Sequence, residues 1–474
     1  MINGIDQAIG RRDFMKGAAA SAASLACWRA WAAKNEVPSY YADYLAGVER
    51  KVRGLAKTCE AGFFFITDTH VKTNHRRSGL LIAELIRRTG LDRVLCGGDF
   101  VEAFGMNYPT DKAAVDFAVD TFTSQWAVPI REAGGRLYSA KGNHDFSVRH
   151  SPAPEDAANG FTYSGVEAKK ILLGRWTERD VVTNPSDPSG CYYYTDDAKA
   201  KVRYIVADTT DSENPGNTAW GVIYGIHEAQ LRWLAESAFG TVPDGYGVVV
   251  MHHIPVTTLV GTEGDRKRYA GLRTLLEEYR RRGKGTVEGV AYDFSKARGE
   301  IFMDLTGHFH AERQAFQSGV LHVTEPCDAA YMDYIYGSAP WCGELPAKKR
   351  GTVFEQTFGI VQIDRKRGIV HITRVGGGQD RAIHTVPRRL KVGESFRFSP
   401  RILKDAVKFG VYDCDRIGFK PNPANRYCRL VEYKNEFASV SADGTVCGRS
   451  AGEAMVVAMN DRFEKEILPV VIHG

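Results

Sequence analysis

The sequence predicts an α/β fold followed by a β-rich C-terminal part, and three observations lead to this prediction. Between residues 61 and 324, short apolar runs of buried-strand type alternate with segments in which apolar residues recur at helical spacing. Polar blocks rich in Asp and His follow several of these runs directly. After about residue 385 the helical spacing stops, and short β-like segments separated by turn residues continue to the end.

The composition is that of an ordinary globular protein of two or three domains. With 474 residues, 43% of them hydrophobic and 25% charged, the chain is not of the disordered, collagen-like or disulfide-stapled class. No apolar stretch reaches the ~18 residues that a transmembrane helix requires. Lys and Arg number 62 against 57 Asp and Glu, and a net charge of +5 over this length is too small for a nucleic-acid binder. We therefore expect no nucleic-acid partner.

The first 33 residues have the three parts of an export signal. A positively charged segment containing Arg11 and Arg12 is followed by a weakly apolar stretch rich in Ala and Gly, and then by a small-residue cleavage site that ends at Ala32. The paired arginines resemble a twin-arginine signal. We therefore expect residues 1–33 to engage the twin-arginine export machinery, which would make the mature protein periplasmic or extracellular. The alternatives are an amphipathic helix that stays on the protein and lipid anchoring at Cys27, which matches a lipobox poorly.

Residues 34–384 contain the expected strands and helices of the α/β part. Strands are expected where apolar residues form short runs or alternate with polar ones, and helices where apolar residues recur every three or four positions. Gly90 suits a helix stop, and Pro129 a helix break. The expected strands are 63–67, 93–96, 137–139, 192–195, 202–207, 248–251, 301–305, 319–324, 358–363 and 368–374. The expected helices are 78–89, 111–133, 227–238 and 270–282.

Five polar blocks each begin a loop directly after one of these strands. They are Asp68-Thr69-His70, Gly98-Asp99, Gly142-Asn143-His144-Asp145, His252-His253 and Gly307-His308-Phe309-His310. Ligands of open α/β sheets bind beyond the carboxyl ends of the strands, so five separate segments can converge at one edge. Carboxylates, imidazoles and one amide oxygen, without a thiolate, suit divalent Zn, Mn, Fe or Co. In the Asp-x-His and His-x-His pairs, residues i and i+2 lie on the same side of an extended segment and can reach one metal cluster.

In this order and over roughly residues 60–380, the blocks resemble those of the calcineurin-like metallophosphoesterase superfamily. The resemblance implies a four-layer αββα sandwich for residues 34–384, in which helices flank two packed mixed sheets. It also implies two divalent metal ions, with their identity left open among Mn, Zn, Fe and Co. It assigns one ion to Asp68, His70 and His310, the other ion to Asn143, His252 and His308, and the bridging position to Asp99.

The resemblance further implies the reaction. A metal-bound hydroxide would attack the phosphorus of a small phosphomonoester or phosphodiester. His144 would face the leaving group as a proton donor or charge stabiliser, and Asp145 would orient it through the other ring nitrogen. His253 is interpreted as a supporting or structural residue, because His252 matches the ligand position. The residues named as candidate substrate contacts are Asn143, Arg149, His150 and Arg313.

Residues 385–474 resemble a bacterial Ig-like group 2 domain, with a hairpin turn at Asp443-Gly444. Such a domain could contact a cell surface or a glycan, or it could be a packing cap on the catalytic domain. Residues 401–430 depart from the pattern. Cys414 with Cys428 or Cys447 is the one disulfide pairing that we consider.

Two alternatives to an exported small-molecule phosphoesterase stay open. One is a nuclease of the same superfamily, which the nearly neutral mature charge disfavours because duplex binding needs many Lys and Arg contacts. The other is an adhesin-like surface protein in which the Ig-like domain is the functional part. Hydrolysis of phosphoesters would distinguish an enzyme from the second alternative.

Overall fold

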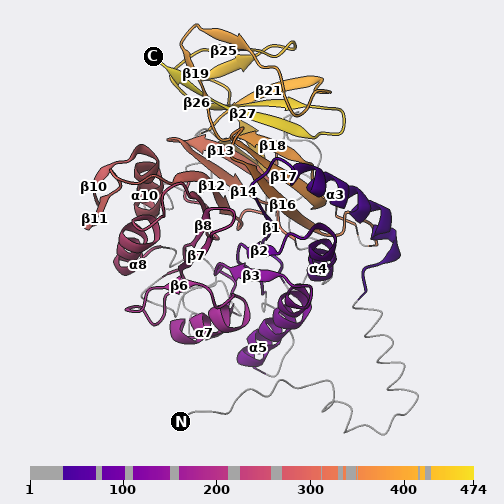
Figure 1. Ribbon diagram of the computed structural model, residues 1–474, viewed down its shortest axis with the longest axis vertical. Coiled ribbons are helices and arrows are strands. Elements are labelled where there is room, and N and C mark those ends of the chain that lie inside the picture. The colour runs from indigo at the N-terminus through magenta and orange to yellow at the C-terminus, as the bar shows by residue number, and fades with distance from the viewer. Residues whose placement is uncertain are drawn as a thin grey trace. The chain divides into compact units, whose positions relative to one another are not determined.

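Two mixed β-sheets lie face to face between helices in the computed structural model (Figure 1). The structure describes residues 36–70, 77–101, 110–149, 160–211, 225–257, 269–310, 312–328, 335–337, 348–349, 351–414, 417–421 and 429–474. The expected signal peptide, Cys27, His150 and Cys428 lie outside the described residues, as does the side chain of Arg149. From Tyr40 to Gly474 the chain forms one unit.

The first sheet has ten strands in the order β21-β26-β27-β18-β17-β16-β1-β2-β3, with β19 paired to β27. Its first part comprises β1 (Ala61–Ile66), β2 (Arg93–Cys96), β3 (Arg136–Ser139), β16 (Thr357–Asp364), β17 (Ile369–Gly376) and β18 (Arg381–His384). The remaining strands are β19 (Arg388–Lys391), β21 (Lys408–Asp413), β26 (Gly452–Met459) and β27 (Lys465–His473). Because β1, β2 and β3 are parallel, their carboxyl ends lie at one edge of the sheet.

The second sheet has seven strands in the order β13-β14-β12-β9-β8-β7-β6. They are β6 (Val182–Thr183), β7 (Tyr193–Asp197), β8 (Val202–Val206), β9 (Gly247–Met251), β12 (Glu300–Thr306), β13 (Arg313–Gln317) and β14 (Val320–Thr324). The four strands β8, β9, β12 and β14 are parallel to one another. Their carboxyl ends therefore form a second edge at which loops can carry a site.

Helices cover the outer faces of the sheets. Figure 1 shows α8 and α10 on one side, and α3 and α4 on the other. The helices are α3 (Ala42–Leu55), α4 (Ser78–Thr89), α5 (Asp111–Phe122), α6 (Val128–Glu132), α7 (Gly165–Arg175), α8 (Glu228–Trp233) and α10 (Ala270–Arg281), with π-helical turns at Thr123–Ala127 and Leu234–Phe239. Gly90, with a φ of 75°, ends α4 as expected. None of the described helices combines the length and the apolar character that crossing a membrane requires.

The main core lies between the two sheets. Phe63 and Tyr138 from the first sheet pack in one apolar cluster with Tyr204, Met251 and Leu305 from the second. A separate apolar cluster lies between the second sheet and its helices. It contains the strand residues whose side chains point to the opposite face, such as the residues of β9 that alternate with Met251. Both faces of the second sheet are therefore buried, and the structure is mixed α/β as predicted.

Short two- and three-stranded sheets complete the fold. They pair β4 (Ser147–Arg149) with β5 (Gly160–Thr162), β10 (Lys284–Val287) with β11 (Val290–Asp293), β15 (Ile335–Gly337) and β22 (Ile417–Pro421) with β23 (Arg429–Tyr433), and β20 (Ser395–Arg397) and β24 (Ala438–Val440) with β25 (Thr445–Gly448). The described residues after 385 contain strands and loops only. This agrees with the predicted β-rich character of the C-terminal part.

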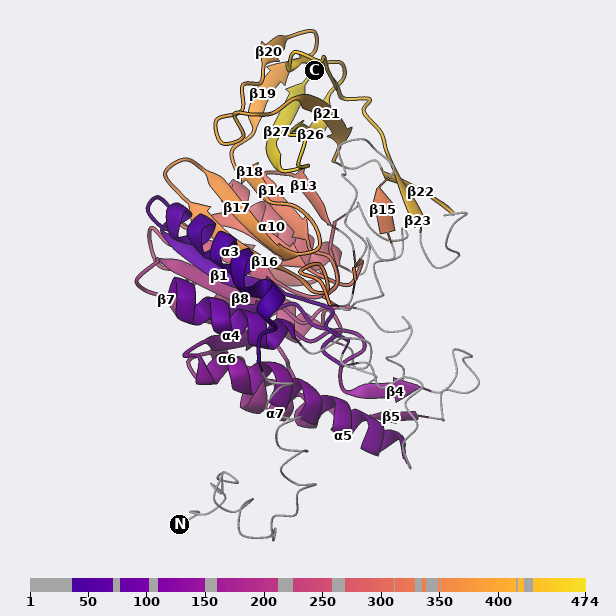
Figure 2. The ribbon, with the colours of Figure 1, turned by 90° about the vertical axis from the view of Figure 1, so that its right-hand side faces the viewer.

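The C-terminal strands continue the first sheet. β27 pairs in parallel with β18 through Arg381 and Lys465, so the sheet crosses the predicted boundary at residue 384 (Figure 2). An Ig-like fold for residues 385–474 stays a prediction. The thiol of Cys447 is free, so the prediction that it pairs with Cys414 is wrong. The C-terminal strands and the α/β part thus share one sheet.

Candidate metal centre

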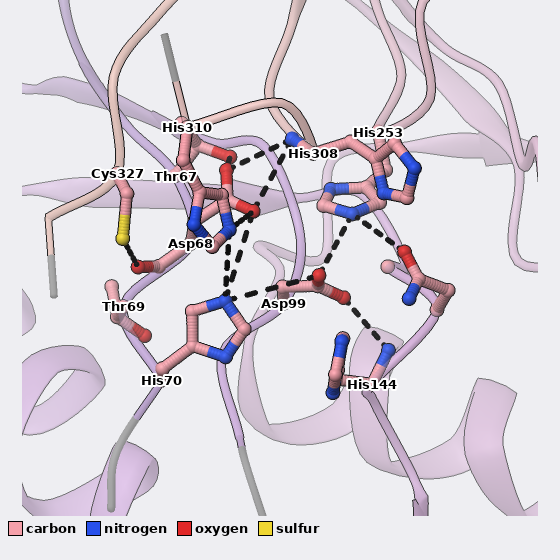
Figure 3. A network of polar contacts seen from close by, with 12 residues as sticks. Thr67, Asp68, Thr69, His70, Asp99, His144, His253, His308, His310 and Cys327 are labelled. Carbon is pink, nitrogen blue, oxygen red and sulfur yellow. Dashed lines mark hydrogen bonds and ion pairs between the residues drawn. The ribbon is translucent and has the colours of Figure 1, made fainter. Parts of the chain in front are cut away.

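The loops that follow β1, β2, β3, β9 and β12 meet where the carboxyl edges of the two sheets approach each other. Figure 3 shows their side chains converging on one small buried volume. Asp68 and His70 follow β1, and Asp99 follows β2, while His308 and His310 follow β12. The structure thus brings these five residues together from the ends of three separate strands.

Five of these side chains sit on left-handed backbone. The φ angles are 53° at Asp68, 40° at His70, 53° at Asp99, 69° at His308 and 51° at His310. Positive φ is uncommon outside glycine and persists where surrounding contacts hold it, above all at functional sites. Here the Asp68 and His70 amides donate to the carbonyls of Gly98 and Asp99, at 2.9 and 3.1 Å. The loops that follow β1 and β2 thus hold each other's backbone in this conformation.

One group of donors surrounds Asp68. His310 Nε2 lies 3.0 Å from Asp68 Oδ1, and His70 Nε2 lies 3.9 Å from the same oxygen. The Nε2 atoms of His70 and His310 are only 3.2 Å apart. One ligand atom from each of Asp68, His70 and Asp99 lies within 4.8 Å of the others, which is close enough to hold one ion. The resemblance assigned Asp68, His70 and His310 to the first metal and the bridging position to Asp99.

A second group of donors surrounds the other side of Asp99. Ligand atoms of Asp99, His253 and His308 also lie within 4.8 Å of one another. His253 Nε2 is 3.0 Å from Asp99 Oδ2 and 3.1 Å from Asn143 Oδ1, and its Nδ1 is 2.8 Å from the Gly97 carbonyl oxygen. A hydrogen bond from Nδ1 to a backbone carbonyl leaves the Nε2 lone pair for a metal. Asp99 belongs to both groups, as a bridging carboxylate must.

The sequence placed the wrong histidine of the His252-His253 pair at this centre. The Nε2 atom of His252 lies 2.7 Å from Asp304 Oδ1, on the helix-covered face of the second sheet, and its Nδ1 lies 2.9 Å from the Ile254 carbonyl oxygen. The reason is the pleat of β9, in which Met251 faces the core between the sheets. His252 therefore points to the opposite face, and His253 to the metal centre.

Asp145 has a different task from the one predicted for it. Its two carboxylate oxygens accept hydrogen bonds from the backbone amides of Asp99, Phe100, Val101 and Gly142, at 3.0, 2.8, 3.3 and 2.8 Å. The expected orientation of His144 by Asp145 is thus replaced by a tie between the loops after β2 and β3. Burial and the charge of Asp99 raise the pKa of Asp145 to about 7. The backbone amide of His144 donates to Asp99 Oδ1 at 2.8 Å, and its half-buried ring lies 5.1 Å from that of His70, measured between centroids.

Of the predicted substrate contacts, only Asn143 lies in the described part of this centre. Arg313 is in β13 with 3% of its surface exposed, so it has no open face toward solvent. The side chain of Arg149 and the whole of His150 lie outside the described part of the chain.

The charge states suit a cation site. Although burial alone would raise the pKa of Asp99, the nearby charges of His253 and His144 lower it well below its usual range. The pKa of His308 is lowered to about 3 by burial and by the charge of His253. Burial lowers the pKa of His253, but the Asp99 charge outweighs this effect and raises it to about 9. Binding of an ion at His253 would therefore release this proton, because histidine ligates a metal as the neutral imidazole. Deprotonated carboxylates among crowded imidazoles form a donor set that fits divalent ions.

Cys327 also belongs to the centre, and the sequence analysis missed it. Its thiol donates to the backbone carbonyl of Asp68 at 3.1 Å, and its sulfur forms a third donor group with His70 and His310. Cys327 follows β14, which is parallel to β12. The strand-end rule that found the other blocks would have found it, had it been applied to the expected strand 319–324.

Comparison with known proteins finds one matching family model and several solved structures to which the chain is similar. A family model described as calcineurin-like phosphoesterase matches residues 62–310, more than half of the chain. Among solved structures, a dimetal phosphatase from Danio rerio is 14% identical with a TM-score of 0.43, covering 68% of this chain and 98% of that chain. The calcineurin-like phosphoesterase YfkN from Bacillus subtilis is 10% identical with a TM-score of 0.32, covering 67% and 89%. No curated protein sequence matches the chain.

Proposed function

The chain belongs to the calcineurin-like phosphoesterase family and is a phosphoric ester hydrolase, and we propose that it cleaves a small phosphomonoester or phosphodiester at a dinuclear metal centre. The observation that carries the proposal is the position of Asp99. Its carboxylate lies in two separate donor groups, one with Asp68 and His70 and one with His253 and His308. A single buried carboxylate shared by two groups supports a pair of ions rather than one.

The residues present fit two such ions. Asp68, His70, His310 and Asp99 would hold the first, and Asn143, His253, His308 and Asp99 would hold the second. When bound, a pair of divalent ions supplies an activated water nucleophile and neutralises charge on the phosphoryl oxygens. Burial of the carboxylates and imidazoles excludes bulk water, which strengthens each of these interactions.

His144 is the proposed proton donor to the leaving group. Its amide is tied to Asp99, and its ring stands beside that of His70 at the half-buried side of the centre. From this position the imidazole can donate a proton to the ester oxygen as it leaves, and it does not occupy a metal position. Asp145 keeps this arrangement in place, because it holds the backbone of the loops that carry Asp99 and Asn143.

The test uses p-nitrophenyl phosphate and bis-p-nitrophenyl phosphate with protein reconstituted in Mn, Zn, Co or Fe. We expect His144→Asn to lower kcat by ~10²–10⁴-fold while metal content is unchanged, because only proton transfer is lost. Asp99→Asn should lose metal as well as activity. Full activity in both variants would refute the site, and inactivity of every metal form on both esters would refute the function.

We also propose export by the twin-arginine pathway. The support is the paired Arg11 and Arg12, followed by a weakly apolar stretch and a small-residue site. Replacing both arginines with lysine should retain the protein in the cytoplasm, as measured by cell fractionation. Export of the double variant at the wild-type level would contradict this proposal.

A further inference from the structure

We infer that Cys327 is a sulfur donor to the ion held by Asp68, His70 and His310, so that this position selects a thiophilic divalent ion such as Zn²⁺, Co²⁺ or Fe²⁺. The inference rests on the proposed function, because it concerns one of the same two metal positions. It changes the donor set predicted from the sequence, which contained no thiolate.

The three donor atoms lie close together. The sulfur of Cys327 and a ring nitrogen from each of His70 and His310 lie within 4.8 Å of one another, and Cys327 is fully buried (Figure 3). Zn–N bonds of ~2.0–2.1 Å and a Zn–S bond of ~2.3 Å in a tetrahedral site separate two ligand atoms by roughly 3.3–3.6 Å. The two imidazole nitrogens are 3.2 Å apart, close to this separation without further movement.

The loop that carries Cys327 is held on both sides. The Glu325 amide donates to the Thr306 carbonyl at 3.0 Å, and the Asp328 amide donates to the Thr67 carbonyl at 3.0 Å. The Asp328 carboxylate accepts a hydrogen bond from Ser78 Oγ at 2.6 Å. The two backbone contacts attach the loop to the ends of β1 and β12, the two strands that carry the other donors, and the Ser78 contact attaches it to α4. The backbone that carries Cys327 is thus held in a fixed position beside the other donors.

The Glu325 side chain adds a second anchor. Its carboxylate lies 2.6 Å from a guanidinium nitrogen of Arg374 and also contacts Arg381, and all three side chains are buried. Glu312, two residues after His310, pairs with Arg374 at 2.9 Å. One buried ionic cluster therefore holds both the histidine loop and the cysteine loop in fixed relation.

The surroundings of Cys327 differ from those of an ordinary buried cysteine. A free buried cysteine usually packs as a small apolar residue. Cys96, for comparison, is a buried residue of β2, whereas Cys327 faces two imidazoles and the Asp68 backbone. A metal ion deprotonates a thiol that coordinates it, so one proton leaves for each Cys327–metal bond formed and no electron is transferred.

The experiment compares full-length wild-type protein with Cys327→Ser, and uses Cys191→Ser as the control because Cys191 is also fully buried. Protein loaded with Co²⁺ should show a near-ultraviolet sulfur-to-cobalt charge-transfer band that Cys327→Ser loses and Cys191→Ser keeps. Competition between Zn²⁺ and Mn²⁺ should show the preference for Zn²⁺ falling at least about tenfold in Cys327→Ser only.

X-ray absorption of the Zn²⁺-loaded wild type tests the inference without any variant. A sulfur scatterer at ~2.3 Å supports it, and a first shell of nitrogen and oxygen alone overturns it. An unchanged cobalt band and unchanged metal preference in Cys327→Ser would overturn it too. If sulfur is bound but no metal form hydrolyses a phosphoester, the proposed function fails while the assignment of Cys327 stands.

Discussion

Replacing Gly142 with alanine is predicted to disable the metal centre from a position that carries no donor atom. Gly142 begins the block that contains Asn143 and His144, and its amide donates to Asp145. A methyl group at its Cα would lie 2.2 Å from both the backbone nitrogen and the Oδ1 atom of Asp99. Only glycine leaves room for the proposed bridging carboxylate to lie against this loop.

The size of the effect follows from this overlap. Ordinary contact with a methyl carbon begins near 3.4 Å, so Asp99 or the loop must retreat by ~1 Å. The amide of Asp99 is fixed by Asp145, so the displacement cannot be absorbed by a flexible side chain alone. Overpacking of this kind costs ~1–3 kcal/mol of stability. A misplacement of ~1 Å in a catalytic group lowers the rate by about 100-fold.

The assay measures three quantities on Gly142→Ala and on a matched control, Gly174→Ala. The quantities are kcat/KM on bis-p-nitrophenyl phosphate, metal ions bound per chain, and the free energy of unfolding in urea. Gly174 lies within α7 and has no atom within 4 Å of an added methyl group, so its variant should keep full activity and gain up to ~1 kcal/mol. Wild-type metal content together with kcat/KM within threefold of wild type in Gly142→Ala would refute the reasoning.

Three further predictions follow from buried polar groups. His253→Ala should lose metal, whereas His252→Ala should keep its metal and lose ~1–3 kcal/mol of stability. Elemental analysis that shows the reverse would restore His252 as the ligand. Burial alone would raise the pKa of Glu466, but its hydrogen bonds lower it. The stability that Glu466 contributes is therefore complete above its unfolded pKa of ~4.3 and lost as pH falls below that value, so Glu466→Gln should flatten this part of the stability–pH curve. Glu312→Gln should destabilise by ~3–5 kcal/mol, because it removes one of the two carboxylates, Glu312 and Glu325, that balance the buried cationic side chains. Lys465→Met should cost less, and equal losses in urea unfolding would contradict the ionic cluster.

Most helices and strands of the α/β part could be predicted from local pattern. The expected helix 78–89 and strand 93–96 agree with the bounds of α4 and β2, because strong apolar periodicity and a terminal glycine specify both. The expected helix 111–133 forms one continuous helical run in which a π-helical turn precedes Pro129 instead of a break. Proline has no backbone N–H, but at the start of α6 this costs no helical hydrogen bond, so the helical run continues.

The choice between His252 and His253 could not be made in the same way. β9 is apolar on both faces, since one face packs against the first sheet and the other against helices. A strand of this type shows no alternation that would reveal which side chain faces the site. The role of Asp145 was hidden for a related reason, because its partners are backbone amides contributed by another strand end.

The sequence by itself determined the α/β class, the positions of the donor-bearing loops and the kind of chemistry, because strand runs and polar blocks are local patterns. Only the tertiary structure decided which atoms meet. It placed His253 rather than His252 beside Asp99, brought Cys327 to His70 and His310, and joined the C-terminal strands to the first sheet through β18 and β27. These outcomes depend on pleat direction, strand order and sheet pairing, which are set by packing between segments distant in the chain.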